Sequence, residues 1–327
     1  MENSKEMDKS QDRKKSGSAE FDLGYINALQ EIGRKEHWWV NSTEIHLKGD
    51  SPAVGDVSNV YRAEWRKASI VVKCVKNTLS DTKKRMEELV REIAVWKTIR
   101  HPNIVMFLGV SFNPDLGLMV LLEEMPGGSL DKYMKQRTSI DKTEIISIAH
   151  NVANACAFLH SCKPPIVHGD IHPENILFTQ FGEPRISDFG LSNFVADAHS
   201  EKKVRDIIRE LYLAPEVLRK GGQAILESDV YAFGVLLLDL FTMKSLEEEG
   251  SLDSASKNDS KSSKMRYKDA TSFLDVTVKF KKRSIPSFIY HMIVRCIQPD
   301  PGRRALFSDL ADEFEKLDEG KAKCALM

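Results

Sequence analysis

The chain of 327 residues has few cysteines, almost no net charge and no long apolar segment. Its five cysteines are scattered and form no C-x-x-C pair, which argues against a disulfide framework or a zinc site and favours a reducing compartment. Lys and Arg number 47 and Asp and Glu 48, and the net charge of −1 disfavours a nucleic-acid-binding protein. The longest apolar run, near 230–241, is interrupted by Asp239 and is too short to span a bilayer. These absences predict a cytoplasmic protein with no nucleic acid as its partner.

Composition divides the chain into segments. Residues 1–20 are rich in Lys, Glu and Ser, which predicts a disordered tail and no signal peptide. Residues 21–43 form an N-terminal extension with a short helix, and residues 44–317 form the main domain. Inside it, residues 245–269 are rich in Ser, Lys and Glu, which predicts a surface insertion. Residues 318–327 form a C-terminal tail.

The order of periodic patterns indicates the fold class. Strand-like alternation occurs at 59–65, 69–75 and 119–122, and apolar residues recur at steps of three and four over 81–99. Helical patterns dominate afterwards, at 144–160, 228–243, 287–296 and 307–317. Strands followed by helices predict an α+β fold with two lobes.

A lysine and a glutamate stand where apolar side chains are expected. Alternation along the strand places Lys73 on one face with Val71, and a lysine on an apolar face needs an anion. Glu92 lies beside Leu89 and Trp96 on the predicted inner side of its helix. Pairing Lys73 with Glu92 would satisfy both charges. The alternative is that each side chain reaches water along its own stem.

A hairpin brings three polar side chains together. Residues 176–178 and 185–187 are predicted to be its two strands, with a turn between them. Asn175 precedes the first strand and Asp188 follows the second, so both oxygens emerge at one end, with Asp170 on the loop that enters the hairpin. Two hard oxygen ligands side by side suit a Mg²⁺ that holds phosphates. The alternative is an ordinary polar hairpin end with capping residues.

Taken in order, these residues resemble the motifs of a protein kinase. The matching positions are Lys73, Glu92, Asp170, Asn175, Asp188-Phe189-Gly190 and Ala214-Pro215-Glu216. The resemblance covers about 44–317. It implies a bilobal fold, with a small antiparallel β-sheet and one key helix in the N-lobe (about 44–124) and a larger, mainly α-helical C-lobe (about 125–317).

Further segments refine the resemblance. Residues 228–234 look like the kinase core helix that anchors the catalytic loop, and Arg304 stands where the family pairs an arginine with Glu216. Residues 101–109 are similar to the tyrosine-kinase-like group, such as Raf-like and mixed-lineage kinases. That group mostly phosphorylates serine and threonine, so a serine/threonine kinase is expected.

The resemblance implies a role for each site residue. Lys73, held by Glu92, would bind the α- and β-phosphates of ATP, and Asn175 and Asp188 would hold Mg²⁺ or Mn²⁺. Asp170 would orient the hydroxyl of a protein substrate and accept its proton. The implied nucleotide pocket comprises Ala53, Val54, Gly55, Ser58, Val60, Val71, Lys73, Leu122, Glu123, Met125 and Leu177.

Several positions depart from the kinase pattern. The glycine-rich loop keeps only Gly55, with side chains at Ala53 and Ser58 that predict weaker ATP binding. Gly169 replaces an arginine that usually pairs with a phosphorylated loop residue; of the residues between Asp188 and Ala214, only Ser192, Ser200 and Tyr212 could carry phosphate. These departures leave a second hypothesis open, a pseudokinase scaffold or allosteric switch with weak nucleotide binding.

Two further departures concern the catalytic residues. His172 stands where serine/threonine kinases place a lysine that contacts the γ-phosphate, so we expect protonation of His172 to restore part of that contact as the pH falls. Arg209 stands where related kinases place a threonine, and could pair with Asp170 and inhibit the resting enzyme. The alternative is that Arg209 faces water.

The last four residues, Cys324-Ala325-Leu326-Met327, fit a C-a-a-X motif and predict farnesylation of Cys324. One lipid with only Lys321 and Lys323 nearby would bind the cytoplasmic face of a membrane weakly and reversibly. The alternative is an ordinary frayed tail. The sequence names neither a protein substrate nor an oligomeric state.

Overall fold

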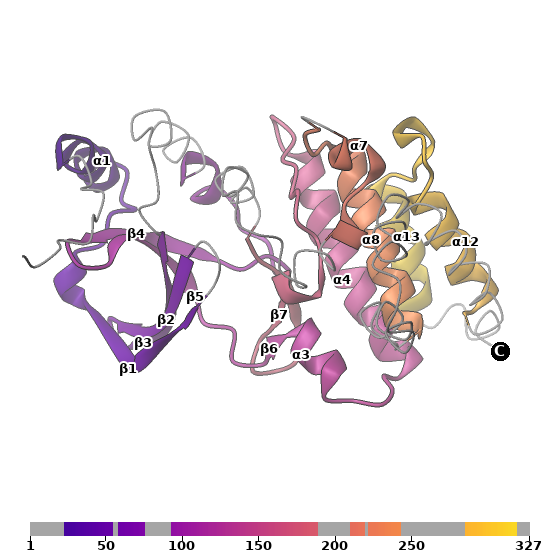
Figure 1. The fold of residues 1–327 in the computed structure, drawn as a ribbon, viewed down its shortest axis with the longest axis horizontal. Helices are drawn as coiled ribbons and strands as arrows, with labels where there is room; N and C mark the ends of the chain where they lie inside the picture. Colours follow the sequence, from indigo (N-terminus) through magenta and orange to yellow (C-terminus); the bar gives the residue numbers. More distant parts are fainter. Residues whose placement is uncertain are drawn as a thin grey trace, which may run out of the picture.

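The computed structural model describes residues 23–54, 58–75, 93–188, 210–219, 222–242 and 285–318. The predictions for 1–20, Gly55, Glu92, Arg209, 245–269 and Cys324 lie outside the described residues. A β-sheet occupies one end of the molecule and a group of helices the other (Figure 1). This arrangement confirms the predicted α+β fold with a small sheet lobe and a larger helical lobe.

The N-lobe is built on a sheet of five strands in the order β1-β2-β3-β5-β4, with every neighbouring pair antiparallel. The strands are β1 (Ile45–Val54), β2 (Ser58–Trp65), β3 (Ala68–Val75), β4 (Phe107–Asn113) and β5 (Gly117–Glu123). The predicted strands at 59–65, 69–75 and 119–122 are found as β2, β3 and β5. The sequence analysis assigned no strand at β4, where the pairing register shifts between Phe107 and Gly109.

Side-chain alternation gives the sheet two different faces. On β3, Ile70, Val72 and Cys74 are buried in a small core of their own. Burial raises the pKa of the Cys74 thiol to about 11, so it remains a neutral apolar filler. Val71 and Lys73 alternate with these residues and therefore lie on the opposite face, where both are half-buried.

An N-terminal helix, α1 (Leu23–Lys35), packs on the N-lobe near β4 (Figure 1). The chain that follows it joins the sheet, since the Val110 N–H donates to the Trp38 carbonyl at 2.9 Å and the Val40 N–H donates to the Val110 carbonyl at 2.8 Å. Trp38 is buried, as are Ile26 and Leu29 of the helix. Together these contacts attach the helix predicted within 21–43 to the sheet.

The C-lobe surrounds one mainly apolar helix that is buried on every side. This helix, α8 (Leu226–Thr242), is buried throughout 228–240, including Ser228, Asp229 and Asp239. A helix without a polar face must lie in the centre of its lobe. The other helices of the C-lobe in the described ranges are α3 (Leu130–Lys135), α4 (Lys142–Ser161), α7 (Pro215–Leu218), α12 (Ser287–Cys296) and α13 (Phe307–Asp318). Of these, α4 and α12 pack directly on α8.

Aromatic packing joins the C-terminal helices to this core. Phe233 of α8 packs edge-on against Phe307 and Phe314 of α13, with ring centroids 5.4 and 6.0 Å apart. The helix α13 also packs along α4, and α12 packs on α8. The helices predicted at 144–160, 228–243, 287–296 and 307–317 are all found, with ends that differ by at most two residues.

A small sheet lies between the lobes, formed by β6 (Gly128–Ser129), β7 (Ile176–Phe178) and β8 (Pro184–Ile186). The antiparallel pair β7 and β8 is the predicted hairpin. The segment before β4 runs beside β8, since Val105 donates to the Ile186 carbonyl and Ile186 donates to the Asn103 carbonyl, both at 2.9 Å. The hairpin is therefore tied to the chain that enters the N-lobe.

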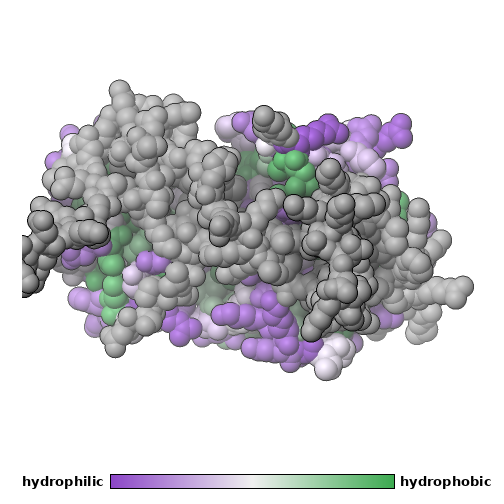
Figure 2. Space-filling view, viewed as in Figure 1, coloured by the Kyte–Doolittle hydropathy of each residue, from purple (hydrophilic) through white to green (hydrophobic). Residues whose placement is uncertain are grey.

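Within the described ranges, no helix is long and apolar enough to cross a membrane. In the view of Figure 2, apolar areas of the described surface are small and separated by polar ones. Scattered apolar side chains of this kind are normal on a protein surface.

Candidate active site

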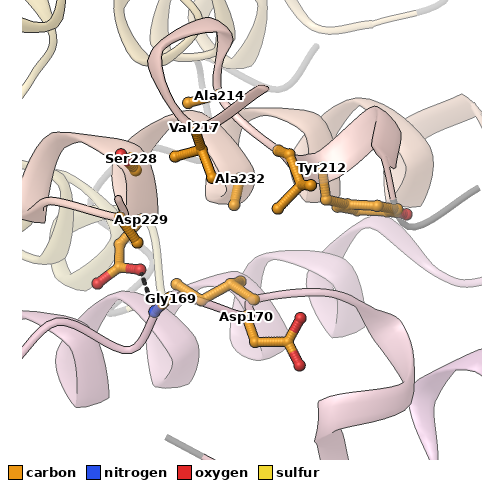
Figure 3. A pocket seen from close by; sticks show the side chains of 11 residues that line it. Gly169, Asp170, Tyr212, Ala214, Val217, Ser228, Asp229 and Ala232 are labelled. Atoms are coloured by element: carbon orange, nitrogen blue, oxygen red, sulfur yellow. Dashed lines mark hydrogen bonds between the residues drawn. The ribbon is translucent and has the colours of Figure 1, made fainter. Parts of the chain in front are cut away.

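The loop that carries Asp170 is held by a buried carboxylate of α8. Asp229 accepts a hydrogen bond from the backbone N–H of Gly169 at 2.8 Å (Figure 3). It also accepts one from the backbone N–H of His168 at 2.8 Å, and its Oδ2 lies 2.9 Å from the His160 Nε2. Asp229 is 1% exposed, so its charge requires these partners. The core helix predicted at 228–234 thus anchors the loop and fixes where Asp170 lies.

The backbone explains why a glycine stands at position 169. Its φ of 77° lies in the left-handed region, which side chains with a Cβ adopt only with strain. Next to it, burial lowers the pKa of His168, and the His168 Nδ1 accepts the Asp170 N–H at 3.2 Å. The sequence analysis recorded only a missing arginine here, because φ cannot be read from residue spacing.

We expect Gly169→Ala to cost about 1 kcal/mol of stability through this strain and about tenfold in activity, because it displaces Asp170. Gly182→Ala is the matched control. Gly182 has a φ of 82° in the turn between β7 and β8, with no atom within 4 Å of an added Cβ. Thermal unfolding should show similar losses for both variants, whereas only Gly169→Ala should lose activity. Equal activity in the two variants would contradict the role given to Gly169.

Asp170 is oriented by its neighbours in the loop. The Asn175 Nδ2 donates to both the backbone carbonyl and the Oδ2 of Asp170, each at 2.8 Å. The His172 Nε2 lies 3.4 Å from the same Oδ2. Because the amide nitrogen of Asn175 is engaged by Asp170, its Oδ1 is left as the oxygen that could bind a metal.

The two ends of the hairpin meet as predicted. Ser187, just after β8, donates from its backbone N–H and its Oγ to the Asn175 carbonyl, at 2.8 and 3.1 Å. Asn175 and Asp188 therefore lie at one end. Asp188 has a φ of 64°, a strained conformation for a residue other than glycine and one that is typical of functional sites.

Lys73 reaches the site from the sheet above. Its Nζ lies 2.9 Å from the Asp188 Oδ2, so the N-lobe lysine meets the C-lobe carboxylate directly. The sequence analysis assigned Glu92 as the partner of Lys73, and Glu92 lies outside the described residues. The ion pair with Asp188 was not predicted, because it joins positions more than 100 residues apart.

The donor set suits a magnesium ion. Asp188 and Asn175 supply hard oxygen ligands, and Mg²⁺ commonly takes one or two protein ligands and completes its shell with phosphate and water oxygens. Among the residues that the structure describes, no group of three or more His, Cys, Asp or Glu side chains could hold a metal by itself. A shared ion of this kind therefore fits these residues better than an all-protein metal cage.

The predicted nucleotide pocket has its upper wall on one face of the sheet. In the strand register Val60 and Val120 flank Lys73 from β2 and β5, and Val71 pairs with Leu122. Directly paired residues point to the same side of a sheet. Val60, Val71, Lys73 and Leu122 therefore share the face that lies opposite the small core.

The connection between the lobes and the hairpin supply the rest of the predicted pocket. Met125 is buried, and its carbonyl accepts the Gly128 N–H at 3.2 Å. The resemblance to kinases implies that backbone groups of residues 123–125 bind the adenine. Of these groups, the Glu123 N–H already donates to the Met106 carbonyl at 3.1 Å. Leu177 lies half-buried on β7, paired with Ser129 of β6.

The phosphate side of the pocket is described only by its backbone. Ala53 pairs with Val60, and Val54 pairs with Asn59, at the start of the connection between β1 and β2. Ser58 begins β2 and pairs with Val75. These positions place the departures from the glycine-rich pattern next to the strand that carries Lys73.

A buried ion pair holds the segment Ala214-Pro215-Glu216 in place. Arg304 contacts both oxygens of Glu216, at 2.6 and 2.9 Å, and no part of its side chain is exposed. It also donates to the carbonyls of Glu227 and Gln298, each at 2.8 Å. Burial alone would raise the pKa of Glu216, but hydrogen bonds from Arg304 and Ser228 outweigh it and lower the pKa. The pair expected between Arg304 and Glu216 is present.

A pocket beside Asp170 is lined mainly by apolar side chains, among them Ile171, Leu213 and Val217 (Figure 3). Tyr212 forms one of its walls. The Tyr212 hydroxyl donates to the Asp239 Oδ2 at 2.7 Å, and the residue is buried. The sequence analysis named Tyr212 as a residue that could carry phosphate. That reading is wrong for this conformation, in which the hydroxyl is bound inside the C-lobe.

Comparison with known proteins gives consistent matches. The family "Protein tyrosine and serine/threonine kinase" matches residues 51–314. The chain is similar to serine/threonine-protein kinase CTR1 of Arabidopsis thaliana, at 35% identity over 193 residues, which is 58% of this chain and 23% of that protein. It is also similar to the probable serine/threonine-protein kinase SIS8 of the same plant, at 30% identity over 277 residues, which is 83% of this chain and 25% of that protein.

A relative from another organism is also named a serine/threonine-protein kinase. The probable serine/threonine-protein kinase pats1 of Dictyostelium discoideum is 30% identical over 286 residues, which cover 81% of this chain and 8% of that protein. The matches therefore span about a quarter or less of the length of these three relatives.

Proposed function

The chain belongs to the protein tyrosine and serine/threonine kinase family, and from this membership we propose that it transfers the γ-phosphoryl group of ATP to serine or threonine hydroxyls of proteins. One observation supports this most strongly. Lys73 from the N-lobe meets Asp188 at 2.9 Å, at the hairpin end where Asn175 also binds Asp170. The residues that we propose as the cation, the metal ligands and the base of phosphoryl transfer thus lie close together, which supports the proposal.

The nucleotide would lie between the sheet and the hairpin. Val71 and Leu122 would cover the adenine from above, and Leu177 would support it from below. Lys73 would contact the α- and β-phosphates, which requires it to exchange part of its contact with Asp188 for phosphate oxygens. Magnesium, when bound by Asp188 and Asn175, would neutralise charge that develops on the phosphates.

Asp170 would act on the protein substrate. The substrate hydroxyl attacks the γ-phosphorus, the bond from that phosphorus to the bridging oxygen breaks, and ADP leaves. The hydroxyl proton passes to the Asp170 carboxylate. Asn175 donates one hydrogen bond to this carboxylate and one to the backbone carbonyl of the same residue, so the direction of the side chain is set before the substrate arrives. Positioning of this kind accounts for much of the catalysis in phosphoryl transfer.

His172 lies beside this carboxylate, where a permanent positive charge would help. We expect His172→Lys to raise the rate of transfer by about tenfold, because a full charge near the transferring group stabilises the transition state. Steady-state kinetics with saturating ATP would measure the change, with His150→Lys, on the half-buried face of α4, as a control for added charge. A rate that stays the same or falls in His172→Lys would contradict this role.

The pseudokinase hypothesis receives no support from the comparisons, whose leading matches are named serine/threonine-protein kinases. The decisive experiment offers the purified chain labelled ATP, Mg²⁺ and a generic protein substrate, with Lys73→Met as the inactive reference. Label incorporated by the wild type above this reference would support the proposal. Binding of ATP without any incorporation would contradict it.

A further inference from the structure

A second ion pair joins the strands on either side of the nucleotide site. The Arg185 Nη1 of β8 lies 2.5 and 2.6 Å from the two carboxylate oxygens of Glu123, the last residue of β5. The Glu123 Oε1 also accepts the Met106 N–H at 2.6 Å, and the Glu123 N–H donates to the Met106 carbonyl. Glu123 therefore ties together β5, β8 and the segment before β4.

The two strands lead to opposite ends of the proposed nucleotide site. After Glu123, β5 continues into the lobe connection at Met125, where the adenine is expected. After Arg185, β8 continues through Ser187 to Asp188, where the metal and phosphates are expected. Arg185 pairs with Leu177 across the hairpin, so both side chains lie on the same face, the one that would support the nucleotide.

The contact is poorly explained as a device for stability. The side chains of Arg185 and Glu123 are only 22% and 19% exposed, so both charges lose much of their hydration. The Arg185 Nε is buried with no hydrogen-bond partner among the described residues, and an unpaired buried donor costs stability. Replacing a buried ion pair by uncharged residues of similar volume is often neutral for stability, provided that the Met106 N–H keeps an acceptor.

We propose that Arg185 is a positioning residue for the nucleotide. By holding Glu123, it fixes the distance between the lobe connection that binds the adenine and the strand end that carries Asp188. This inference rests on the proposed function, because the site it serves is the nucleotide site of a kinase. It gives the chain a further residue on which the affinity for ATP and the rate of transfer both depend.

The test uses the double variant Arg185→Met/Glu123→Gln, which removes both charges but keeps an oxygen that can accept the Met106 N–H. We expect KM for ATP and Kd for ADP to rise by about tenfold and kcat to fall. Losses of this size are typical when a residue that orients the ligand-binding residues is removed. The melting temperature should stay within a few degrees of the wild type. Arg185→Lys keeps the positive charge on a single nitrogen atom. It should therefore bind the nucleotide more tightly than the double variant does.

The control is another Arg–Glu pair remote from the site. The Arg295 Nη1 of α12 lies 2.7 and 3.0 Å from the two oxygens of Glu313 on α13, at the helical end of the molecule (Figure 1). Arg295→Met/Glu313→Gln should leave KM and Kd unchanged.

The outcomes separate the two proposals. A wild type that binds ADP, with a double variant that binds it equally well, would overturn the inference alone. Arg185→Met alone supplies the same comparison if the double variant does not fold, because it removes the contact with Glu123 and unchanged KM and Kd in that variant would also overturn the inference. A wild type that neither binds ADP nor transfers phosphate would overturn the proposed function and this inference together.

Discussion

Replacement of Asp170 by asparagine is expected to lower the rate of phosphoryl transfer by about 10³-fold, because asparagine has the shape of aspartate but cannot accept the proton of the substrate hydroxyl. The amide oxygen of the new side chain can still accept the hydrogen bond from Asn175. The loop is held independently, through Asp229 and the backbone of His168 and Gly169. The effect should therefore be confined to kcat.

Single-turnover kinetics and ADP titration measure the two quantities separately. Asp170→Asn should bind ADP with a Kd within about threefold of the wild type, because Asp170 is not among the residues that would contact the nucleotide. Asp312→Asn, on the exposed side of α13, is the control for loss of one carboxylate. Retention of more than a tenth of the wild-type rate by Asp170→Asn would contradict the role of this residue as the base.

The second large effect concerns stability. Arg304→Met is expected to lower the free energy of unfolding by about 3 kcal/mol, because it leaves the Glu216 carboxylate without its buried partner. That loss corresponds to a melting temperature lower by roughly 5–10 °C. The control is Arg295→Met, which breaks a pair whose arginine is 43% exposed and should cost less than about 1 kcal/mol. Equal losses of stability in the two variants would contradict the expectation that breaking the buried pair costs more than breaking the exposed one.

The pH dependence gives an independent check. The pKa of Glu216 is lowered in the folded state, so the unfolded state binds the proton more readily. The stabilisation is therefore complete above the ordinary value of 4.5 and is lost as the pH falls through the folded pKa. Urea titrations should show that the difference in the free energy of unfolding between the wild type and Arg304→Met becomes smaller below pH 4.5. A gap that widens on acidification would be inconsistent with this ion pair.

Features that depend on local order were predicted correctly. The hairpin at 176–186 followed from two short strands and a turn, and α12 and α13 followed from apolar residues at helical spacing. The resemblance to kinases then correctly predicted the family, the bilobal fold and the pairing of Glu216 with Arg304. Local periodicity and ordered motifs carry this information because neighbouring residues on the chain determine them.

Features that depend on distant contacts or on backbone angles were missed. The contact of Lys73 with Asp188 and that of Glu123 with Arg185 each join residues far apart in the sequence, and nothing in either local pattern indicates the partner. The left-handed backbone at Gly169 and the burial of Tyr212 follow from how α8 packs beneath the loop. Both were therefore interpreted from residue type alone, as a lost arginine and a candidate phosphate acceptor.

The attachment of α1 to β4 has a consequence for synthesis on the ribosome. The Trp38 carbonyl accepts the N–H of Val110, which lies 72 residues later in the chain. At about 5–20 residues per second, the apolar side of α1 emerges roughly 4–14 s before the strand that covers it. During that interval Ile26, Leu29 and Trp38 have no sheet to cover them, so these residues become buried only after β4 has been synthesised.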